Sequence, residues 1–217
     1  MKFGVPEIRD WVFDLDNTLY PPASAMYDAI SLRITAYVAR VTGLDRPAAE
    51  QLQARYFHDY GATVVGMVKH HDVDPHHFLA DVHDVDAACI DPDPELGALI
   101  AALPGRKIVF TNGGGGHPRR VLARLGIAQQ FAHLFDLEAA GMVPKPQRGA
   151  YERLIAACAI APRHALLIED TPRNLEPAYE LGFITVLVGS IRPGPRPCYI
   201  HHTAPDLKSF LRGFPGV

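Results

Sequence analysis

Short apolar runs alternate with helical patterns along most of the chain. The runs are rich in Val, Ile, Leu and Phe and are short enough to be buried strands. Three helical patterns begin with a residue followed by proline, which suits a first turn because that turn does not use the proline N–H. This order predicts an α/β fold with a doubly wound, mostly parallel sheet covered by helices on both faces. The predicted strands are residues 11–13, 107–110, 134–137, 165–168 and 184–188, and the predicted helix starts are Asp93–Pro94, His117–Pro118 and Thr171–Pro172.

One long segment departs from this alternation. Apolar residues from Met26 to Val41 recur at three- and four-residue steps, and the sequence Asp-Arg-Pro at residues 45–47 opens a second helix. Further helical patterns follow near residues 64–68 and 76–82, without a convincing strand between them. The expected division is a Rossmann-like catalytic core at residues 1–20 and 90–217 and an inserted all-helical cap at residues 21–89. From Pro193 onward the chain is rich in turn residues, and the pattern allows one short edge strand at residues 198–201.

Polar side chains follow three of the predicted strands directly. The carboxyl ends of parallel strands share one edge of a sheet, and ligands bind at that edge in open α/β folds. We therefore expect these side chains to meet. They are Asp14 and Asp16 after the first run, Thr111 and Asn112 after the second, and Glu169 and Asp170 after residues 165–168, with Lys145 opening the helix after the fourth strand.

Converging carboxylates repel one another unless a cation lies between them. Carboxylate oxygens with room for water and phosphate oxygens suit Mg²⁺, and Lys145 supplies a second positive charge. Such a site would keep Asp14 ionised as a nucleophile for phosphoryl transfer. Asp16 would protonate the leaving alkoxide and then deprotonate the attacking water, while Thr111 would bind a phosphoryl oxygen.

Each of these pieces also has an ordinary structural interpretation. The two aspartates could be a turn or a helix cap, Thr111–Asn112 a loop start, Lys145 a solvated lysine, and residues 169–171 a cap with acidic neighbours. Four such elements, each following a strand in consecutive order, favour a site over coincidence.

The same four elements resemble the motifs of the haloacid dehalogenase-like hydrolases over essentially the whole chain. The matching sequences are DLDNT, the Thr-Asn pair, Lys-Pro before a helix, and Glu-Asp-Thr with Asn174. The resemblance implies that Asp14 is the nucleophile of an aspartyl phosphate intermediate. It also implies that Asp16 is the general acid and base and offers its backbone carbonyl to Mg²⁺, that Asp170 binds the metal directly, and that Glu169 acts through water. Thr111 and Lys145 carry over as phosphate-binding residues.

The helical insertion is similar to the family's first type of cap. DLDNTLYPP, RYFHDYGATVVGM, VHDVD and LPGRKIVFTN further resemble the subgroup of pyrimidine 5′-nucleotidases. That similarity implies a nucleoside 5′-monophosphate as substrate. Tyr20, Tyr60 and Thr63 are then candidates to face the substrate, although both tyrosines fit core packing equally well.

Four glycines, residues 113–116, stand where relatives usually carry side chains. Their backbone N–H groups could form an anion-binding nest, in which Asn112 and Gly113 contact the substrate. The alternative is a flexible solvent loop.

Several other activities remain open for this set of residues. A phosphomutase would use the same intermediate, and a phosphatase could act on a sugar phosphate or phosphoglycolate instead of a nucleotide. An idle phosphate-binding protein could retain the site, although it would need no nucleophile. Dehalogenation is disfavoured because Asp16, the metal ligands and Lys145 point to phosphate.

The amino-acid composition indicates which class of molecule the protein binds. The 217 residues include 21 Lys and Arg and 24 Asp and Glu, a net charge of −3 without long runs of one sign. This balance argues against nucleic acid polymers and anionic lipid and favours a small phosphorylated metabolite. The apolar runs are too short for a membrane span, and the start lacks a signal-peptide pattern, so we expect a cytoplasmic protein. The oligomeric state is left open.

Cysteine and histidine usage adds two structural expectations. The chain has three cysteines, Cys89, Cys158 and Cys198, which we expect to be reduced core residues. Five histidines between His70 and His83 lie close together in sequence without a metal-binding pattern, which predicts a solvated helical face.

Overall fold

A computed structural model of the protein describes residues 7–189 and 195–214. Its centre is a six-stranded sheet in the order β3-β2-β1-β4-β5-β6, in which every pair of neighbours is parallel. The α/β class with a doubly wound sheet is therefore confirmed. The strands are β1 (Asp10–Phe13), β2 (Arg106–Phe110), β3 (His133–Phe135), β4 (Ala165–Glu169), β5 (Ile184–Val188) and β6 (His202–Ala204).

Five strands lie where the apolar runs predict them, and the sixth is displaced. The edge strand predicted at residues 198–201 is wrong, because the strand begins at His202. Thr185 explains the shift: its hydroxyl donates to the Tyr199 carbonyl at 2.7 Å and accepts from the His201 N–H at 3.1 Å. These bonds hold the segment in a turn until His202 can pair with β5. Residues 193, 194 and 215–217 of the predicted turn-rich tail lie outside the described residues, as do residues 1–6.

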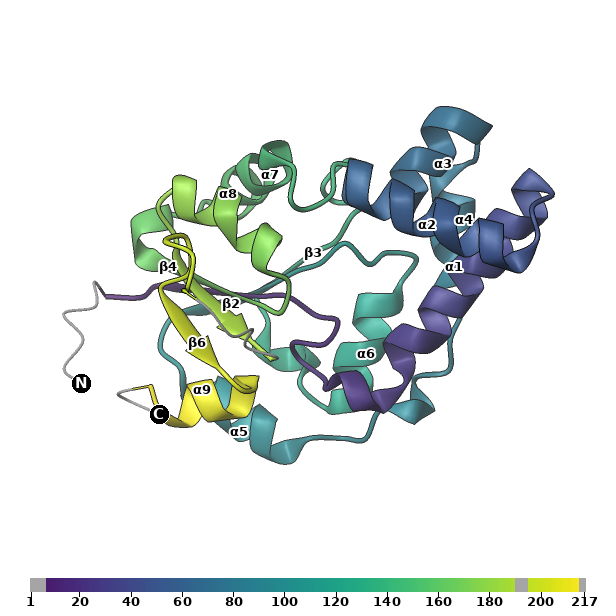
Figure 1. The fold of residues 1–217 in the computed structure, drawn as a ribbon. Helices are drawn as coiled ribbons and strands as arrows, with labels where there is room; N and C mark the ends of the chain where they lie inside the picture. The colour runs from purple at the N-terminus through teal and green to yellow at the C-terminus, as the bar shows by residue number, and fades with distance from the viewer. Residues whose placement is uncertain (1–6, 190–194, 215–217) are drawn as a thin grey trace.

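Alternate residues of each strand face opposite layers of helices. Trp11 and Phe13 pack on one side, whereas Val12 packs on the other, as the two-residue repeat of a strand requires. The first layer contains α5 (Pro94–Ala102), α6 (His117–Leu125) and α9 (Leu207–Arg212), and the second contains α7 (Arg148–Cys158) and α8 (Leu175–Glu180), as Figure 1 shows.

The predicted helix starts differ in their local chemistry. Asp93 is the N-cap of α5, and its carboxylate accepts from the Leu96 N–H at 2.9 Å. The start predicted at His117 is off by one residue, because Gly116 in the left-handed conformation is the N-cap. Thr171 leads first into a 3₁₀ turn, Pro172–Asn174, and α8 follows.

Helices alone occupy the segment between β1 and α5, where the structure describes every residue. They are α1 (Met26–Thr42), α2 (Arg46–Tyr60), α3 (Thr63–His71) and α4 (Pro75–Val82), with short 3₁₀ turns at Pro22–Ser24 and Ala87–Cys89. They form a separate group at one end of the molecule, which we call the cap (Figure 1). The cap has its own apolar core, which includes Tyr37, Met67 and Phe78 and reaches Leu137 of the sheet domain. Packing against Leu137 fixes the position of the cap beside the sheet.

Two expectations about single residue types need correction. Cys158 is buried, but Cys89 and Cys198 are exposed, so the prediction that all three cysteines belong to the core is wrong. The thiols are free. His70, His76 and His77 are exposed as expected, whereas His83 is only 6% exposed, so the solvated-face interpretation fails for that residue. Over the described ranges of the chain, none of the helices is both long and apolar enough to cross a bilayer.

Candidate active site at the carboxyl ends of β1, β2 and β4

A buried lysine joins two of the predicted acidic residues. Lys145 is 1% exposed, and its Nζ donates to Asp14 Oδ1 at 2.6 Å, to Glu169 Oε2 at 2.7 Å and to the Phe110 carbonyl at 2.9 Å. The lysine follows β3 rather than a fourth strand, and it lies in the loop before α7. Its burial is tolerated because three acceptors surround the ammonium group.

Asn112 holds the lysine loop in place. Its side-chain oxygen accepts from the Lys145 N–H at 2.8 Å, and its side-chain nitrogen donates to the Lys145 carbonyl at 3.0 Å and to the Gly61 carbonyl of the cap at 3.4 Å. The amide is thus occupied by backbone groups. Asn112 orients Lys145 and links core to cap, which differs from the substrate contact that the sequence suggested.

Three carboxylates gather beside the lysine. Oxygens of Asp14, Glu169 and Asp170 all lie within 4.8 Å of one another. Burial, followed by the charge of Glu169, raises the pKa of Asp14 to about 7, and burial also raises the pKa of Glu169 and Asp170. Lys145 lowers the pKa of Asp14, but one ammonium group does not balance three carboxylates.

This donor set fits a hard divalent cation. The oxygens are close enough to share one ion, and none of the three side chains offers a soft ligand. Asn17 adds a second observation. Its side-chain oxygen is buried, has no hydrogen-bond partner among the described residues, and borders the same cleft as Asp170. An unpaired buried oxygen that borders the same cleft as Asp170 is well suited to a metal ion or its water.

Asp16 has a different environment from Asp14. Its Oδ1 accepts from the Tyr20 hydroxyl at 2.5 Å and contacts His117 Nε2 at 2.8 Å. Burial alone would raise the pKa of Asp16, but the charge and hydrogen bond of His117 and the hydrogen bond of Tyr20 lower it below its ordinary value. Tyr20 is 1% exposed and is occupied by this contact. The structure thus places Tyr20 in the site, where its hydroxyl holds Asp16.

The glycine loop is packed between the site and the cap. Thr111 Oγ1 accepts from the Gly113 N–H at 2.9 Å. A Cβ on Gly113 would lie 3.3 Å from Thr111 Oγ1 and 3.6 Å from Asp16 Oδ2, and a Cβ on Gly115 would lie 2.5 Å from the Leu79 carbonyl of α4. Gly115 also donates its N–H to Glu138 at 2.9 Å. Leu79 of α4 leaves no room for a Cβ on Gly114 or Gly115, and Gly113 and Gly114 are buried, so the loop does not extend into solvent as the alternative interpretation expected.

The two predicted cap residues are engaged within the cap. The Tyr60 hydroxyl contacts His70 Nε2 at 2.7 Å, and the Thr63 hydroxyl donates to the Gln53 carbonyl at 3.3 Å. Neither hydroxyl contacts the acidic cluster. Tyr27, at the start of α1, is 42% exposed, and burial and then the charges of Asp16, Asp170 and Asp14 raise its pKa to about 12.

A cleft of about 970 Å³ opens beside Asp170. Its walls include Asn17 and Arg173 of the core and His58 of the cap. Arg173 bridges the two parts, because its guanidinium donates to the Phe57 carbonyl at 3.1 Å and lies 4.3 Å from the Phe57 ring centre. A cleft of this volume has room for a small ligand.

Sequence reasoning missed three residues of this arrangement. Thr18 donates to Asp14 Oδ2 at 3.0 Å, His117 contacts Asp16, and His83 of the cap stacks on His117 with ring centres 5.0 Å apart. Thr18 could have been found as the last residue of DLDNT. The two histidines gave only a weak signal, since nothing in the sequence pairs a residue after α4 with the start of α6.

Comparison with known proteins agrees with this geometry. The family described as haloacid dehalogenase-like hydrolase matches residues 11–182. The chain belongs to this family. The match runs from β1 to the end of α8, so it includes every strand end that contributes to the haloacid dehalogenase-like site described above.

The individual proteins that resemble this chain share only a modest part of its sequence. Over 137 residues the chain is 28% identical to "Phosphate metabolism protein 8" of Saccharomyces cerevisiae, covering 58% of this chain and 42% of that protein. Over 80 residues it is 36% identical to "Enolase-phosphatase E1" of Frankia alni, covering 37% of this chain and 32% of that protein. The chain therefore spans less than half the length of these curated relatives. Among solved structures, CbbY from Rhodobacter sphaeroides in complex with phosphate superposes with a TM-score of 0.66 at 16% identity, covering 94% of this chain and 96% of that one. At that identity the similarity concerns the fold.

Proposed function

We propose that the protein is a Mg²⁺-dependent phosphomonoester hydrolase that acts through an aspartyl phosphate on Asp14, with a nucleoside 5′-monophosphate as substrate. The observation that carries the proposal is the contact of Lys145 with both Asp14 and Glu169, beside Asp170. The names of the two curated relatives, which refer to phosphate metabolism and to a phosphatase, support the same class of reaction.

The reaction has two half-reactions, the formation and the hydrolysis of the aspartyl phosphate. In the first, an Asp14 oxygen attacks phosphorus and the bond from phosphorus to the leaving oxygen breaks. Asp16, which takes up a proton when the anionic phosphate binds beside it, gives that proton to the leaving oxygen. In the second, a water oxygen attacks phosphorus, Asp16 takes a proton from this water, and the bond between Asp14 and phosphorus breaks. Lys145 neutralises phosphoryl charge while its N–H groups stay on Asp14, Glu169 and the Phe110 carbonyl. Thr111, with the glycine-loop N–H groups other than those of Gly113 and Gly115, binds phosphoryl oxygens.

Asp14, Asp170 and the Asp16 backbone carbonyl would hold the metal, with Glu169 acting through water. When bound, Mg²⁺ supplies positive charge that offsets the phosphate and the clustered carboxylates. Lys145 also supplies positive charge, and its contact with Asp14 Oδ1 fixes the direction of that carboxylate. With the charges balanced in this way, Asp14 is ionised at neutral pH and can act as a nucleophile.

The cleft beside Asp170 supports a substrate larger than phosphate. Arg173 in the wall of this cleft lies against the Phe57 ring and links cap to core. Its planar guanidinium group suits stacking on a planar base. A sugar phosphate or phosphoglycolate lacks such a base, and a phosphomutase would return the phosphoryl group to its substrate.

Phosphate release with and without Mg²⁺ tests the proposal. The purified protein is assayed with p-nitrophenyl phosphate, pyrimidine and purine nucleoside 5′-monophosphates, glucose phosphates and phosphoglycolate, and with 2-chloropropionate as a dehalogenase control. We expect Mg²⁺-dependent release that chelation abolishes reversibly, with nucleotides preferred and no chloride released. Asp14→Asn should be inactive while folded. Activity in Asp14→Asn would reject the nucleophile, and binding of phosphate without turnover in the wild type would leave only the idle binding protein.

A further inference from the structure

We propose that His117 is a positioning residue for Asp16, and that His83 of the cap holds His117, so that the seated cap sets the direction of the proton carrier. The proposal rests on the proposed function, because it concerns the residue that exchanges protons with the leaving group and with water. It starts from the two oxygens of Asp16, which have different surroundings.

Among the residues that the structure describes, both hydrogen-bonding contacts of the Asp16 carboxylate are made by Oδ1. The Tyr20 hydroxyl and His117 Nε2 both reach Oδ1, at 2.5 and 2.8 Å. Oδ2 points toward the glycine loop, since a Cβ on Gly113 would lie 3.6 Å from it. That loop and Thr111 form the expected phosphate cradle. The two contacts on Oδ1 therefore turn Oδ2 toward the reacting group and leave it as the oxygen that carries the exchanged proton.

His117 has little freedom to move. It is 1% exposed and is the first residue of α6, so helix geometry fixes its backbone. One edge of its ring lies over the glycine loop, where a Cβ on Gly113 would be 3.3 Å from His117 Cδ2. Its face stacks on His83, with ring centres 5.0 Å apart and an angle of 18° between the rings. The imidazole is thus held from the core on one side and from the cap on the other.

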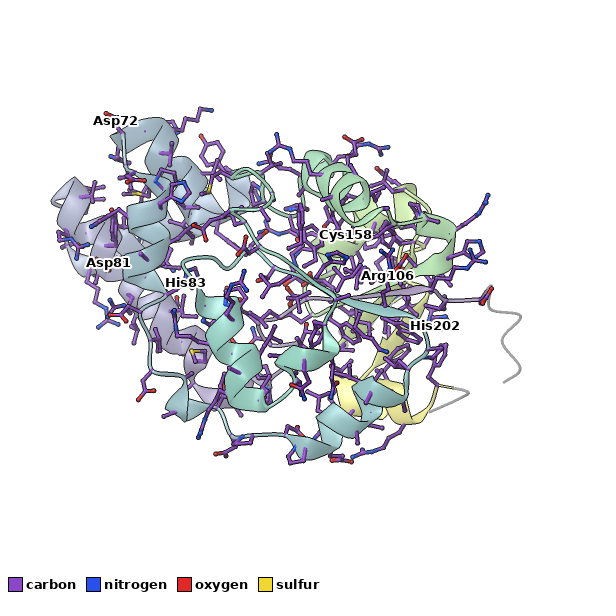
Figure 2. All side chains as sticks on the ribbon, turned by 180° about the vertical axis from the view of Figure 1, so that it is seen from behind. Asp72, Asp81, His83, Arg106, Cys158 and His202 are labelled. Atoms are coloured by element: carbon purple, nitrogen blue, oxygen red, sulfur yellow. The ribbon has the colours of Figure 1, made fainter. Side chains whose placement is uncertain are left out.

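His83 is itself fixed at the end of α4. It is 6% exposed, and its Nδ1 lies 3.0 Å from the Leu79 carbonyl, which can only accept, so Nδ1 carries the proton of this bond. Arg120, one turn after His117 in α6, donates to the His83 carbonyl at 2.6 Å. Figure 2 shows His83 where the cap helices meet the core, far from Asp72 at the outer end of the cap. The two histidines therefore form part of the contact between cap and core.

The arrangement couples the cap to proton transfer. When the cap packs against the core, His83 stacks on the His117 ring and keeps it against Asp16. Without the cap, that face of the His117 ring loses its stacking partner. Loss of the contact should impair the steps that need a proton from Asp16 more than the binding of phosphate. An alkyl leaving group needs that proton, whereas p-nitrophenolate is stable as an anion and leaves without it.

Two leaving groups separate a positioning role from a structural one. Turnover of a nucleoside 5′-monophosphate and of p-nitrophenyl phosphate is measured for His117→Leu, which lacks a donor, and for His117→Gln, which keeps a side-chain N–H near the position of Nε2. His133→Gln, at an exposed position of β3, is the matched control. Circular dichroism and thermal melting verify that each variant is folded.

We expect His117→Leu to lower kcat for the nucleotide about 100-fold, within the range attributed to general acid–base catalysis, without raising KM. With p-nitrophenyl phosphate, rapid mixing should show a burst of nearly one p-nitrophenolate per active site, followed by slow turnover, because the second half-reaction still needs Asp16. His117→Gln should recover most of the loss, and His133→Gln should equal the wild type. His83→Ala should reproduce the effect more weakly, and His83→Phe, which keeps a ring for stacking, should not.

Equal loss on both substrates without a burst, or a folded His117→Leu with normal nucleotide turnover, would overturn the proposal. A folded His117→Gln that is no better than His117→Leu would overturn it as well. These results differ from failure of the proposed function, in which the wild type itself would release no phosphate in Mg²⁺.

Discussion

Lys145 Nζ lies 2.6 Å from Asp14 Oδ1, although the two residues are 131 positions apart in the chain. The lysine comes from the loop after β3 and the aspartate from the end of β1, and β2 lies between these strands in the sheet. Lys145 also contacts Glu169 at the end of β4. One ammonium group therefore connects the loop after β3 with two strand ends, and its removal should affect stability as well as catalysis.

Replacing Lys145 by methionine should destabilise the protein in the absence of metal. The change leaves Asp14 and Glu169 buried without their shared partner, and breaking a buried ion pair in this way costs about 3–5 kcal/mol. Urea denaturation at neutral pH would measure the loss, and Lys69→Met, at an exposed position of α3, is the control. Adding Asp14→Asn should recover part of the lost stability. A Lys145→Met protein as stable as the control would contradict the charge balance described here.

The acidic cluster should make the free energy of unfolding depend on pH, and Mg²⁺ should change that dependence. Burial, then the charge of Glu169, raises the folded-state pKa of Asp14 to about 7, and burial raises that of Glu169. Between the ordinary carboxyl pKa of about 4 and pH of about 7, the folded protein thus binds more protons than the unfolded chain. The free energy of unfolding should therefore fall as pH rises through this window, and the loss should be complete above it.

Mg²⁺ should oppose that loss, because the ion replaces the protons. Denaturation in chelator should give lower stability near pH 8 than near pH 6, and added Mg²⁺ should stabilise more at the higher pH. The double variant Asp14→Asn, Glu169→Gln should lose most of this dependence on pH. A wild type whose stability rises from pH 6 to pH 8 in chelator would show that the cluster is ionised without a cation.

The sheet and its reactive edge could be predicted from the sequence because strand geometry is simple. Phe13 pairs with Val109 and with Ile168, so the residues that follow these positions must reach the same edge. Apolar runs identify buried strands, and the polar residues directly after them become candidates without knowledge of side-chain directions. Asp14, Glu169 and Asp170 were predictable for this reason.

Directions within the cap could not be predicted in the same way. Which face of a helix meets the core depends on packing between helices far apart in sequence, and this decides that Tyr60 contacts His70. His83 stacks on His117 only because α4 approaches the glycine loop closely enough for Leu79 to touch it. No local pattern encodes that approach. The glycines were the one available signal, and they were equally compatible with a flexible loop.

Two glycine-to-alanine substitutions that strain the backbone in the same way test whether α4 packs against the glycine loop. Gly115 and Gly126 have φ of +59° and +77°, so alanine is strained at either position. A Cβ on Gly126 meets nothing within 4 Å, whereas a Cβ on Gly115 would lie 2.5 Å from the Leu79 carbonyl. Gly126→Ala should cost about 1 kcal/mol from backbone strain. Gly115→Ala should cost about 2 kcal/mol more, because α4 must move away. Urea denaturation gives the difference, and equal costs would show that the cap does not press on the loop.

Gly115→Ala should also lower turnover of nucleotides more than Gly126→Ala does. The displaced α4 carries His83 at its end, so the support of His117 should weaken together with the seat of the cap. Assays of kcat on the folded variants would detect the effect. Equal activity of the two variants would show that the position of α4 does not affect catalysis.

Tyr27 is a second cap residue to test for substrate selection. It is 42% exposed, borders a hollow of the cap together with Phe57 and Thr63, and has a pKa raised by burial and by the charges of Asp16, Asp170 and Asp14. Tyr60 was the candidate from sequence, but its hydroxyl contacts His70 and its ring lies beside Tyr56. Stacking of a base on an aromatic ring is worth about 1–3 kcal/mol, so Tyr27→Leu should raise KM for nucleoside monophosphates about tenfold and leave that for p-nitrophenyl phosphate nearly unchanged. Tyr179→Leu, at a similarly exposed position of α8, serves as the control. A change in selectivity with Tyr60→Ala and none with Tyr27→Leu would return the role to Tyr60, because the substrate would then have to enter between α2 and the lysine loop.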